Sequence, residues 1–265
     1  MLQESFIFLP GIQDRTEKRL WSVGITTWDH LLDAKALPGV SRERLSFWKS
    51  RIRLAQQLMQ TPQGINHLAR QFGTRYAWRA YAHVMDNPRF VDIETTEYRN
   101  DVTVVGVSDG EFYQAFVKGK NLDRNSLRQA FAGASCIITF NGSSFDLPII
   151  ERNFPGVLPE VPHLDLRHIC GQAGLKGGLK RIEQHLAISR AGTIRELNGA
   201  DAIMLWYRHK FGDENALRDL VDYNAADVLN LAPLAELIIP SLWNNVRYSK
   251  ELPFPSLWRY DEHEA

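Results

Sequence analysis

The sequence predicts an α/β protein in which a mixed β-sheet is flanked by helices and preceded by a small all-helical module. From residue 89 onward, short runs of β-branched and aromatic residues alternate with helical patterns. The second and third of these runs are joined by a hairpin turn signal, as in antiparallel strands. By contrast, the first 60 residues contain helical patterns and tight turns. A chain of 265 residues is long enough for one large or two modest domains.

The predicted strands and helices follow a definite order. Residues 90–94 form a short buried strand, and Val102–Ser108 suits a central strand because it is rich in β-branched residues. Asp109-Gly110 is a hairpin turn signal that leads into a strand over residues 111–117. Further strands are expected over residues 136–140 and 163–166, and helices over 121–132, 145–153, 178–187, 195–210 and 213–239. Three antiparallel strands, followed by strands alternating with helices, are the layout of a ribonuclease-H-like α/β fold.

We divide the chain into four parts on the basis of these patterns. They are a helical-hairpin module (1–60), a connector with one helix (61–88), a ribonuclease-H-like domain (89–243) and a C-terminal tail (244–265). The tail contains Pro253, Pro255 and Trp258. It is expected either to pack back on the body or to contact a partner.

The N-terminal module contains a weak internal repeat. Leu-Pro-Gly-Ile at residues 9–12 opens a helical pattern to about Trp21, and Leu-Pro-Gly-Val at residues 37–40 opens another to about Leu58. A helix that begins after a tight glycine turn directs unpaired N–H groups outward, where a phosphate can bind. The repeat resembles helix-hairpin-helix elements, which bind nucleic-acid backbones, although Gln13 and Ser41 replace the usual second glycine. Two hairpins packed for structural reasons, or a protein-binding module, are the alternatives.

The composition is that of an ordinary globular protein, with 44% hydrophobic and 23% charged residues. Lys+Arg and Asp+Glu both total 31, so the net charge neither supports nor excludes nucleic-acid binding. No apolar run approaches the length of a membrane span, and the N-terminus lacks the pattern of a secretory signal. Two cysteines are too few for a disulfide framework or a thiolate zinc site. We therefore expect a cytoplasmic protein with no membrane partner.

Asp92 and Glu94 are two residues apart on a predicted buried strand, so both side chains project from one face of the sheet. Two neighbouring carboxylates repel each other and lose hydration on burial. A bridging divalent cation is the most direct compensation. Alternatively, the pair lies at an exposed strand end.

Two further motifs contain acidic residues. Asp146 follows the strand and turn of Thr-Phe-Asn-Gly-Ser-Ser-Phe-Asp, where open α/β sheets bind ligands, although it could simply begin a helix. Tyr223 and Asp227 are four residues apart on a predicted helix and share one face. The phenol could orient an attacking water, or it could be a buried Tyr bonded to an Asp. Four oxygen ligands without cysteine favour two Mg²⁺ or Mn²⁺ ions over zinc.

Three segments resemble, in their order along the chain, the three exonuclease motifs of the DEDD superfamily in its tyrosine subclass. They are Asp92-Ile-Glu94-Thr95, Asn141-Gly-Ser-Ser-Phe-Asp146 and Tyr223-Asn-Ala-Ala-Asp227. His163-Leu-Asp165-Leu and Leu179-Lys-Arg-Ile-Glu183 extend the likeness to bacterial ribonuclease-H-like predicted exonucleases. The resemblance covers about residues 88–240. It implies that Asp92, Glu94, Asp146 and Asp227 hold two metal ions and that Tyr223 positions the water. We expect Asp165 to have a structural role, such as capping a helix.

Five residues are candidate substrate contacts: Thr95, Asn141, Phe145, Lys176 and Lys180. Asn141 could instead stabilise its turn, and Phe145 could pack in the core rather than against a base. The two lysines, which lie in a glycine-rich stretch, could contact backbone phosphates or be solvated.

The predicted activity is a two-metal 3′–5′ exonuclease that releases nucleoside monophosphates from single-stranded DNA or RNA. A ribonuclease-H-like endonuclease and a catalytically idle nucleic-acid-binding or scaffolding protein are the alternatives. No motif distinguishes DNA from RNA, since that needs contacts to the 2′-hydroxyl.

Overall fold

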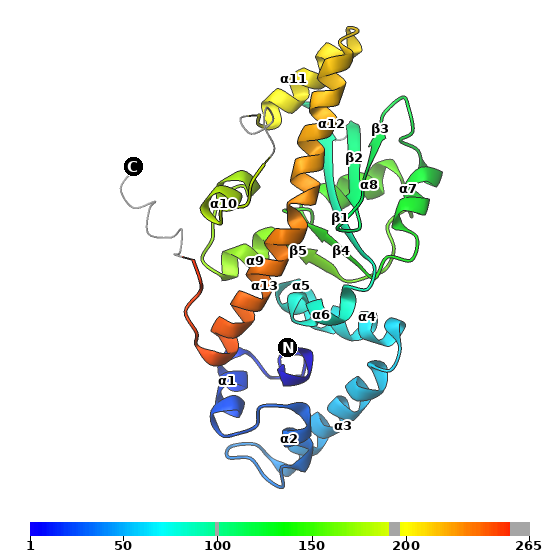
Figure 1. Cartoon of the computed structure of the whole chain (residues 1–265). Helices are drawn as coiled ribbons and strands as arrows, with labels where there is room; N and C mark the ends of the chain where they lie inside the picture. Colours follow the sequence, from blue (N-terminus) through cyan, green and yellow to red (C-terminus); the bar gives the residue numbers. More distant parts are fainter. Residues whose placement is uncertain (99–100, 191–196, 255–265) are drawn as a thin grey trace.

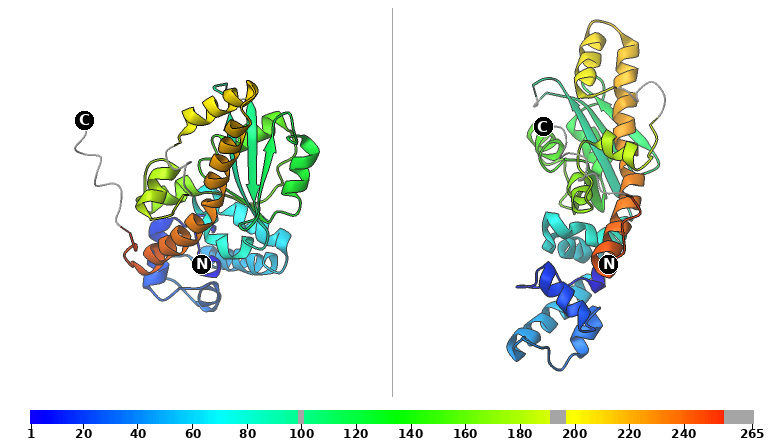
Figure 2. Two further views of the ribbon diagram at one scale, coloured as in Figure 1. Left: turned by 45° about the horizontal axis from the view of Figure 1, so that its top comes forward. Right: turned by 90° about the vertical axis from the view of Figure 1, so that its left-hand side faces the viewer.

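The computed structural model describes residues 1–98, 101–190 and 197–254 (Figure 1). The sheet lies at one end of an elongated molecule, and the N-terminal helices lie at the other (Figure 2, right). A long helical segment, drawn in orange, runs from the sheet to the N-terminal helices. It consists of α12 (Glu214–Leu229) and α13 (Leu231–Tyr248). The sheet and the N-terminal helices are therefore connected by packing as well as by sequence.

The predicted mixed sheet is confirmed, with five strands in the order β3-β2-β1-β4-β5. β1 pairs antiparallel with β2, and β2 with β3, whereas β1–β4 and β4–β5 are parallel. The strands are β1 (Pro88–Thr95), β2 (Val102–Ser108), β3 (Tyr113–Val117), β4 (Cys136–Thr139) and β5 (His163–Asp165). Val102–Ser108 has the predicted bounds because its β-branched residues are buried along its whole length.

Helices cover both faces of the sheet (Figure 2, left). On one face, Val91, Ile93 and Val105 form a core with α7 (Arg124–Phe131) and α8 (Asp146–Asn153). On the other face, Val104 packs with residues of α11 (Gly199–Lys210) and α12. The helices between β5 and α11 are α9 (Leu166–Gln172) and α10 (Leu179–His185). Residues 195 and 196 of the helix predicted over 195–210 lie outside the described residues.

The N-terminal region is helical, as predicted, and its two Leu-Pro-Gly turns are alike. Its elements are η1 (Leu2–Glu4), α1 (Asp14–Ser22), α2 (Trp28–Asp33) and α3 (Arg42–Leu58). Gly11 and Gly39 have φ angles of 79° and 73°, which only glycine adopts without strain. Each turn accepts a hydrogen bond from a helix of the other half: Trp48 Nε1 donates to Pro10 O at 3.1 Å, and Arg19 Nη2 to Pro38 O at 3.4 Å.

The connector contains more than the single helix predicted, and this prediction was wrong. Residues 62–84 form four short helical elements: α4 (Pro62–Gln71), α5 (Gly73–Tyr76), η2 (Ala77–Ala80) and α6 (Tyr81–Val84). They lie between the N-terminal helices and the sheet, and one hydrophobic cluster runs from Leu2 through Trp78 to Trp243. The short helices escaped prediction because this tertiary packing, rather than a long amphipathic pattern, stabilises them.

The helical segment from Glu214 to Tyr248 is the one segment of the described chain with the length and mean hydropathy of a membrane span. Half of its most apolar window is buried inside the protein, where α12 packs on β1 and β2. It is therefore a core helix of this fold. α13 also crosses the boundary predicted at residue 243, so the chain does not change its structure there. Residues 255–265 of the predicted tail lie outside the described residues.

Candidate metal centre

β1 directs two carboxylates toward α12. Residues alternate across a strand, and Val91 and Ile93 face the core beneath α7 and α8. Asp92 and Glu94 therefore project from the opposite face, where Glu94 is buried and Asp92 is partly buried. The prediction that the two acids share a face is confirmed, and burial rules out an exposed strand end for Glu94.

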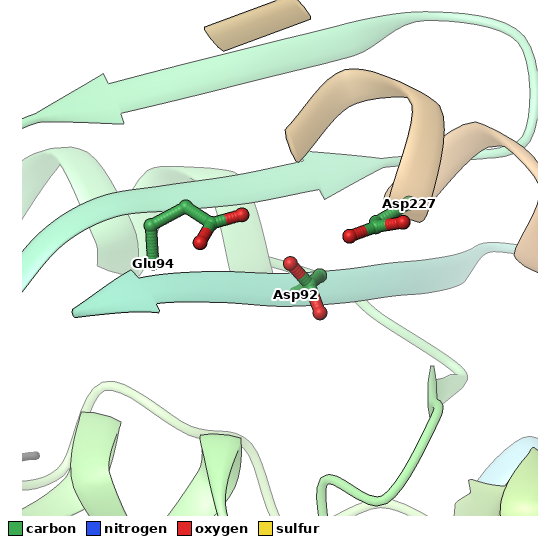
Figure 3. Close-up of side chains that lie close together, drawn as sticks. All are labelled: Asp92, Glu94 and Asp227. Carbon is green, nitrogen blue, oxygen red and sulfur yellow. The ribbon is translucent and has the colours of Figure 1, made fainter. Parts of the chain in front are cut away.

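α12 supplies the third carboxylate. Asp227 is buried, and Figure 3 shows the side chains of Asp92, Glu94 and Asp227 directed toward one another in the space between β1 and α12. One carboxylate oxygen from each lies within 4.8 Å of the others. Tyr223 lies one turn before Asp227 on the same helix and is also buried. Three of the four acids expected to bind metal are thus brought together from two distant parts of the chain.

Asp146 lies beside this cluster but is not within the 4.8 Å group. Its Oδ1 accepts a hydrogen bond of 3.0 Å from the backbone N–H of Ile93, the residue between Asp92 and Glu94. The turn that carries Asp146 is held by Asp165, which accepts hydrogen bonds from the N–H groups of Asn141 (2.7 Å) and Ser143 (3.0 Å). Asp165 also caps α9 through the N–H of Arg167. The predicted structural role of Asp165 is confirmed.

Asn224 is a site residue for which the sequence predicted no role. Its Nδ2 donates a hydrogen bond of 2.8 Å to Asp92 Oδ2, and its Oδ1 accepts one of 2.8 Å from the Tyr113 hydroxyl. Space for this amide comes from Gly106, which is paired with Asp92 in the sheet. A Cβ at residue 106 would lie only 1.9 Å from Asn224 Oδ1. The single glycine among the valines and the threonine of this strand was the signal available in the sequence.

Burial and mutual repulsion alter the acidity of all these groups. Burial, with added repulsion from Asp146 and Asp227, raises the pKa of Asp92 well above its usual value. Burial and Asp227 do the same to the pKa of Glu94, against the opposing effects of Asn224 and Lys180. Burial also raises the pKa of Asp227, although Arg190 opposes it.

Burial raises the pKa of Asp146 to about 7, against the opposing hydrogen bond from Ile93. Burial, followed by the charge of Asp227, raises the pKa of Tyr223 above its ordinary value. The phenol is therefore protonated at neutral pH and can donate a hydrogen bond.

The cluster has the properties of a cation site. Glu94 Oε1 is buried and has no hydrogen-bond partner among the described residues, which is costly for a carboxylate oxygen. Three hard oxygen ligands converge on one space. A divalent cation would satisfy the unpartnered oxygen and offset the repulsion that raises these pKa values. The residues present therefore fit a metal ion, with Asp92, Glu94 and Asp227 as its ligands.

Basic groups border the cluster on the side of α10. Lys180 Nζ lies 4.7 Å from the centre of the Tyr223 ring, and it is buried without a hydrogen-bond partner in the described chain. Arg190 forms ion pairs with Asp227 and Glu183. A cavity with a volume of about 340 Å³ is lined by both basic residues and by the segment Ala187–Ser189. Of the predicted substrate contacts, Lys180 is the one placed against Tyr223.

The other predicted contacts occupy varied positions. Thr95 is at the end of β1, one residue beyond Glu94. Asn141 has a positive φ of 71°, and its side-chain oxygen accepts hydrogen bonds from Ser144 (2.9 Å) and Arg167 (2.8 Å), as a turn residue would. Phe145 is partly buried and packs against the core beneath α8. Lys176 is exposed on the turn before α10. A substrate role for these four residues stays a prediction.

Residues 89–239 match the family described as the RNase_H superfamily. The match covers more than half of the chain and includes all five strands except the first residue of β1, and the chain belongs to this superfamily. No curated protein and no solved structure matches it. Proteins of this superfamily are usually nucleases that use divalent metal ions, and the acidic cluster lies within the matched region.

Proposed function

We propose that this protein is a metal-dependent nuclease, a 3′–5′ exonuclease that hydrolyses the ends of single-stranded nucleic acid to nucleoside monophosphates. The main supporting observation is that one carboxylate oxygen from each of Asp92, Glu94 and Asp227 lies within 4.8 Å of the others, on a fold of the RNase_H superfamily. A structural cluster would pair its carboxylates with cations or donors. Here a buried oxygen of Glu94 has none among the described residues.

Each residue has a distinct role in this proposal. Asp92, Glu94 and Asp227 would hold Mg²⁺ or Mn²⁺, and Asp146 would contribute to the binding of a second ion. In two-metal sites, the cations supply an activated water and stabilise the leaving oxygen of the phosphodiester. Tyr223 donates a hydrogen bond that orients the attacking water.

An exonuclease is favoured over an endonuclease by the position of the tyrosine. Tyr223 lies one helical turn from Asp227 with its ring buried, as in the motif of the tyrosine-type DEDD exonucleases. Lys180 Nζ lies 4.7 Å from the centre of that ring, and this proximity to Tyr223 supports the proposal that it contacts a substrate phosphate. Thr95, Asn141, Phe145 and Lys176 complete the proposed contacts with a terminal nucleotide.

The N-terminal module is proposed to hold the nucleic acid outside the active site. Its two glycine turns line one cavity of about 180 Å³, together with Arg19 and Arg44. Both arginines are exposed, so they are accessible to backbone phosphates. A protein partner at this module is the alternative.

The test is cleavage of 5′-labelled single-stranded DNA and RNA of matched sequence with Mn²⁺, Mg²⁺ or EDTA. We expect a metal-dependent ladder that shortens from the 3′ end. Asp92→Asn should lower the rate at least about 100-fold, because it removes a charged ligand while keeping the side-chain shape. Glu160→Gln, which removes an exposed carboxylate, is the control and should cleave at the normal rate.

The products distinguish the candidate functions. Mononucleotides support the exonuclease, whereas internal fragments would indicate an endonuclease built on the same cluster. Full metal-dependent cleavage by Asp92→Asn would overturn the proposed site. No cleavage together with no Mn²⁺ binding in calorimetry would favour a nucleic-acid-binding or scaffolding protein.

A further inference from the structure

Arg190 connects a proposed metal ligand to a buried acid outside the cluster. Its Nη2 donates hydrogen bonds to Asp227 Oδ1 and, at 2.9 Å, to Glu183 Oε1, while its Nε donates to Glu183 Oε2. The arginine side chain is 4% exposed and that of Glu183 is 1% exposed. A guanidinium this deeply buried next to a cation site needs an explanation, since a metal ion would repel it.

Glu183 provides a fixed anchor for this arginine. It holds the guanidinium through two hydrogen bonds, the planar geometry in which Arg–carboxylate pairs are strongest. On its other side, Glu183 accepts a hydrogen bond of 3.0 Å from Asn230, the residue between α12 and α13. Asn230 also donates to the carbonyl of Ser189 at 3.3 Å. Arg190 is thus held in place independently of Asp227.

This arrangement leaves the acidic cluster largely intact. The charge of Arg190 is balanced by Glu183, so Asp92, Glu94 and Asp227 retain most of their attraction for a cation. A carboxylate has two oxygens, and Arg190 contacts only one oxygen of Asp227. The other oxygen is free of this contact and can serve as a ligand. A hydrogen bond to one oxygen of a ligating carboxylate typically fixes the orientation of the other.

We propose that Arg190 is a positioning residue that, together with Glu183 and Asn230, holds Asp227 in the orientation that binds metal. The inference rests on the proposed function, because it takes Asp227 to be a metal ligand. The opposite role would be competition, in which Arg190 occupies the position of the cation and must leave before a metal binds. The anchoring by Glu183 and Asn230 favours positioning.

The test is Mn²⁺ affinity, measured by calorimetry on the full chain. Arg190→Met alone would leave the charge of Glu183 buried and unpaired, and this could unfold the protein. The double variant Arg190→Met/Glu183→Gln removes both charges and should keep the fold, as circular dichroism and unfolding would verify. We expect it to bind Mn²⁺ roughly 10–100-fold more weakly than the unaltered chain.

Two further variants complete the design. Arg190→Lys keeps a positive charge that can reach Asp227 and should recover part of the affinity, whereas a purely structural role would give no such rescue. Arg208→Gln removes an arginine from an exposed ion pair with Asp213 and should leave Mn²⁺ binding unchanged. Cleavage by the double variant should also be partly restored at high Mn²⁺ concentration.

The outcomes separate this proposal from the proposed function. Unchanged or tighter Mn²⁺ binding by the folded double variant would overturn positioning and leave the nuclease proposal standing, and tighter binding would indicate competition. No Mn²⁺ binding by the unaltered chain would overturn both. Weaker binding with partial rescue by lysine supports the positioning role.

Discussion

The protein buries carboxylates in two regions and treats them in opposite ways. In the N-terminal region, Glu17 accepts hydrogen bonds from Ser5 Oγ (2.9 Å) and Phe6 N (2.6 Å) and forms an ion pair with Arg79. On the sheet, Glu94 lies among other acids, and one of its oxygens is buried without a partner in the described chain. In the first region the protein itself pairs both carboxylate oxygens of Glu17. In the second, the described residues leave Glu94 Oε1 unpaired, beside two further acids that could share a cation with it.

The difference shows how a structural acid can be distinguished from a functional one. Both Glu17 and Glu94 are buried, so burial alone does not separate them. What separates them is whether the protein supplies the compensating charge and donors. Glu17 connects α1 to Arg79 in η2 and so stabilises the junction of the N-terminal helices and the connector. Glu94 retains a carboxylate oxygen without a partner in the described chain, at the proposed active site.

The largest expected effect on stability is at the N-terminal ion pair. Arg79→Met leaves the Glu17 charge buried and uncompensated, so the free energy of unfolding should fall by about 3–5 kcal/mol. Chemical denaturation would measure it. Arg70→Met breaks an exposed ion pair with Glu160 and should cost no more than about 1 kcal/mol. If Arg79→Met and Arg70→Met lowered the free energy of unfolding equally, Arg79 would not be compensating a buried charge on Glu17, and the comparison of the two regions would fail.

An intermediate effect is expected at Gly106. In Gly106→Ala the new Cβ would overlap Asn224 Oδ1, so Asn224 must shift and its hydrogen bond to Asp92 is lost. Unfolding free energy should fall by about 1–3 kcal/mol, and calorimetry should show weaker Mn²⁺ binding. Gly171→Ala, on α9 with open space at the Cβ position, is the matched control. Its stability should be unchanged or raised by up to about 1 kcal/mol.

The smallest effect is a change in how stability depends on pH. In the folded chain burial raises the pKa of Asp146 to about 7, above its ordinary value of 3.8. Between these two pH values the folded state binds more protons than the unfolded state. The stability that the protonated Asp146 carboxyl contributes is therefore lost as the pH rises through about 7. In EDTA, Asp146→Asn should therefore make the unfolding free energy fall less steeply with rising pH. The difference in slope should be up to about 1.4 kcal/mol per pH unit, the value for one bound proton. An unaltered slope would show that Asp146 does not titrate in this range.

Much of the acidic cluster was predictable from the sequence. Neighbouring carboxylates on a buried strand repel each other, and a bound cation is one of the few ways to compensate that repulsion. Asp92 and Glu94 two residues apart on an apolar strand, and Asp227 one turn after Tyr223, are local patterns that assign each side chain to a face. The structure brings these faces together. It places Asp146 against the backbone of Ile93 and outside the group of Asp92, Glu94 and Asp227. No local sequence pattern predicts how far Asp146 lies from those acids.

The partners of the acids were not predictable for the same reason. Asn224 and Asp92 are 132 residues apart, and their contact depends on the absence of a side chain at Gly106. The link from Arg190 to Asp227 joins α12 to the segment that follows α10, and the two residues are 37 positions apart in the chain. The short helices of the connector likewise owe their stability to the core that they share with Trp243.

By itself, the sequence determined the order of the five strands, the α/β class of the fold and the acids that face the same side of the sheet. These properties follow from side-chain periodicity and local backbone preference, which act within a few residues. Only the tertiary structure decided which donors surround each acid, since packing brings together groups from distant parts of the chain. That packing completes the hydrogen bonding of Glu17 and leaves Glu94 with an unsatisfied oxygen toward Asp92 and Asp227.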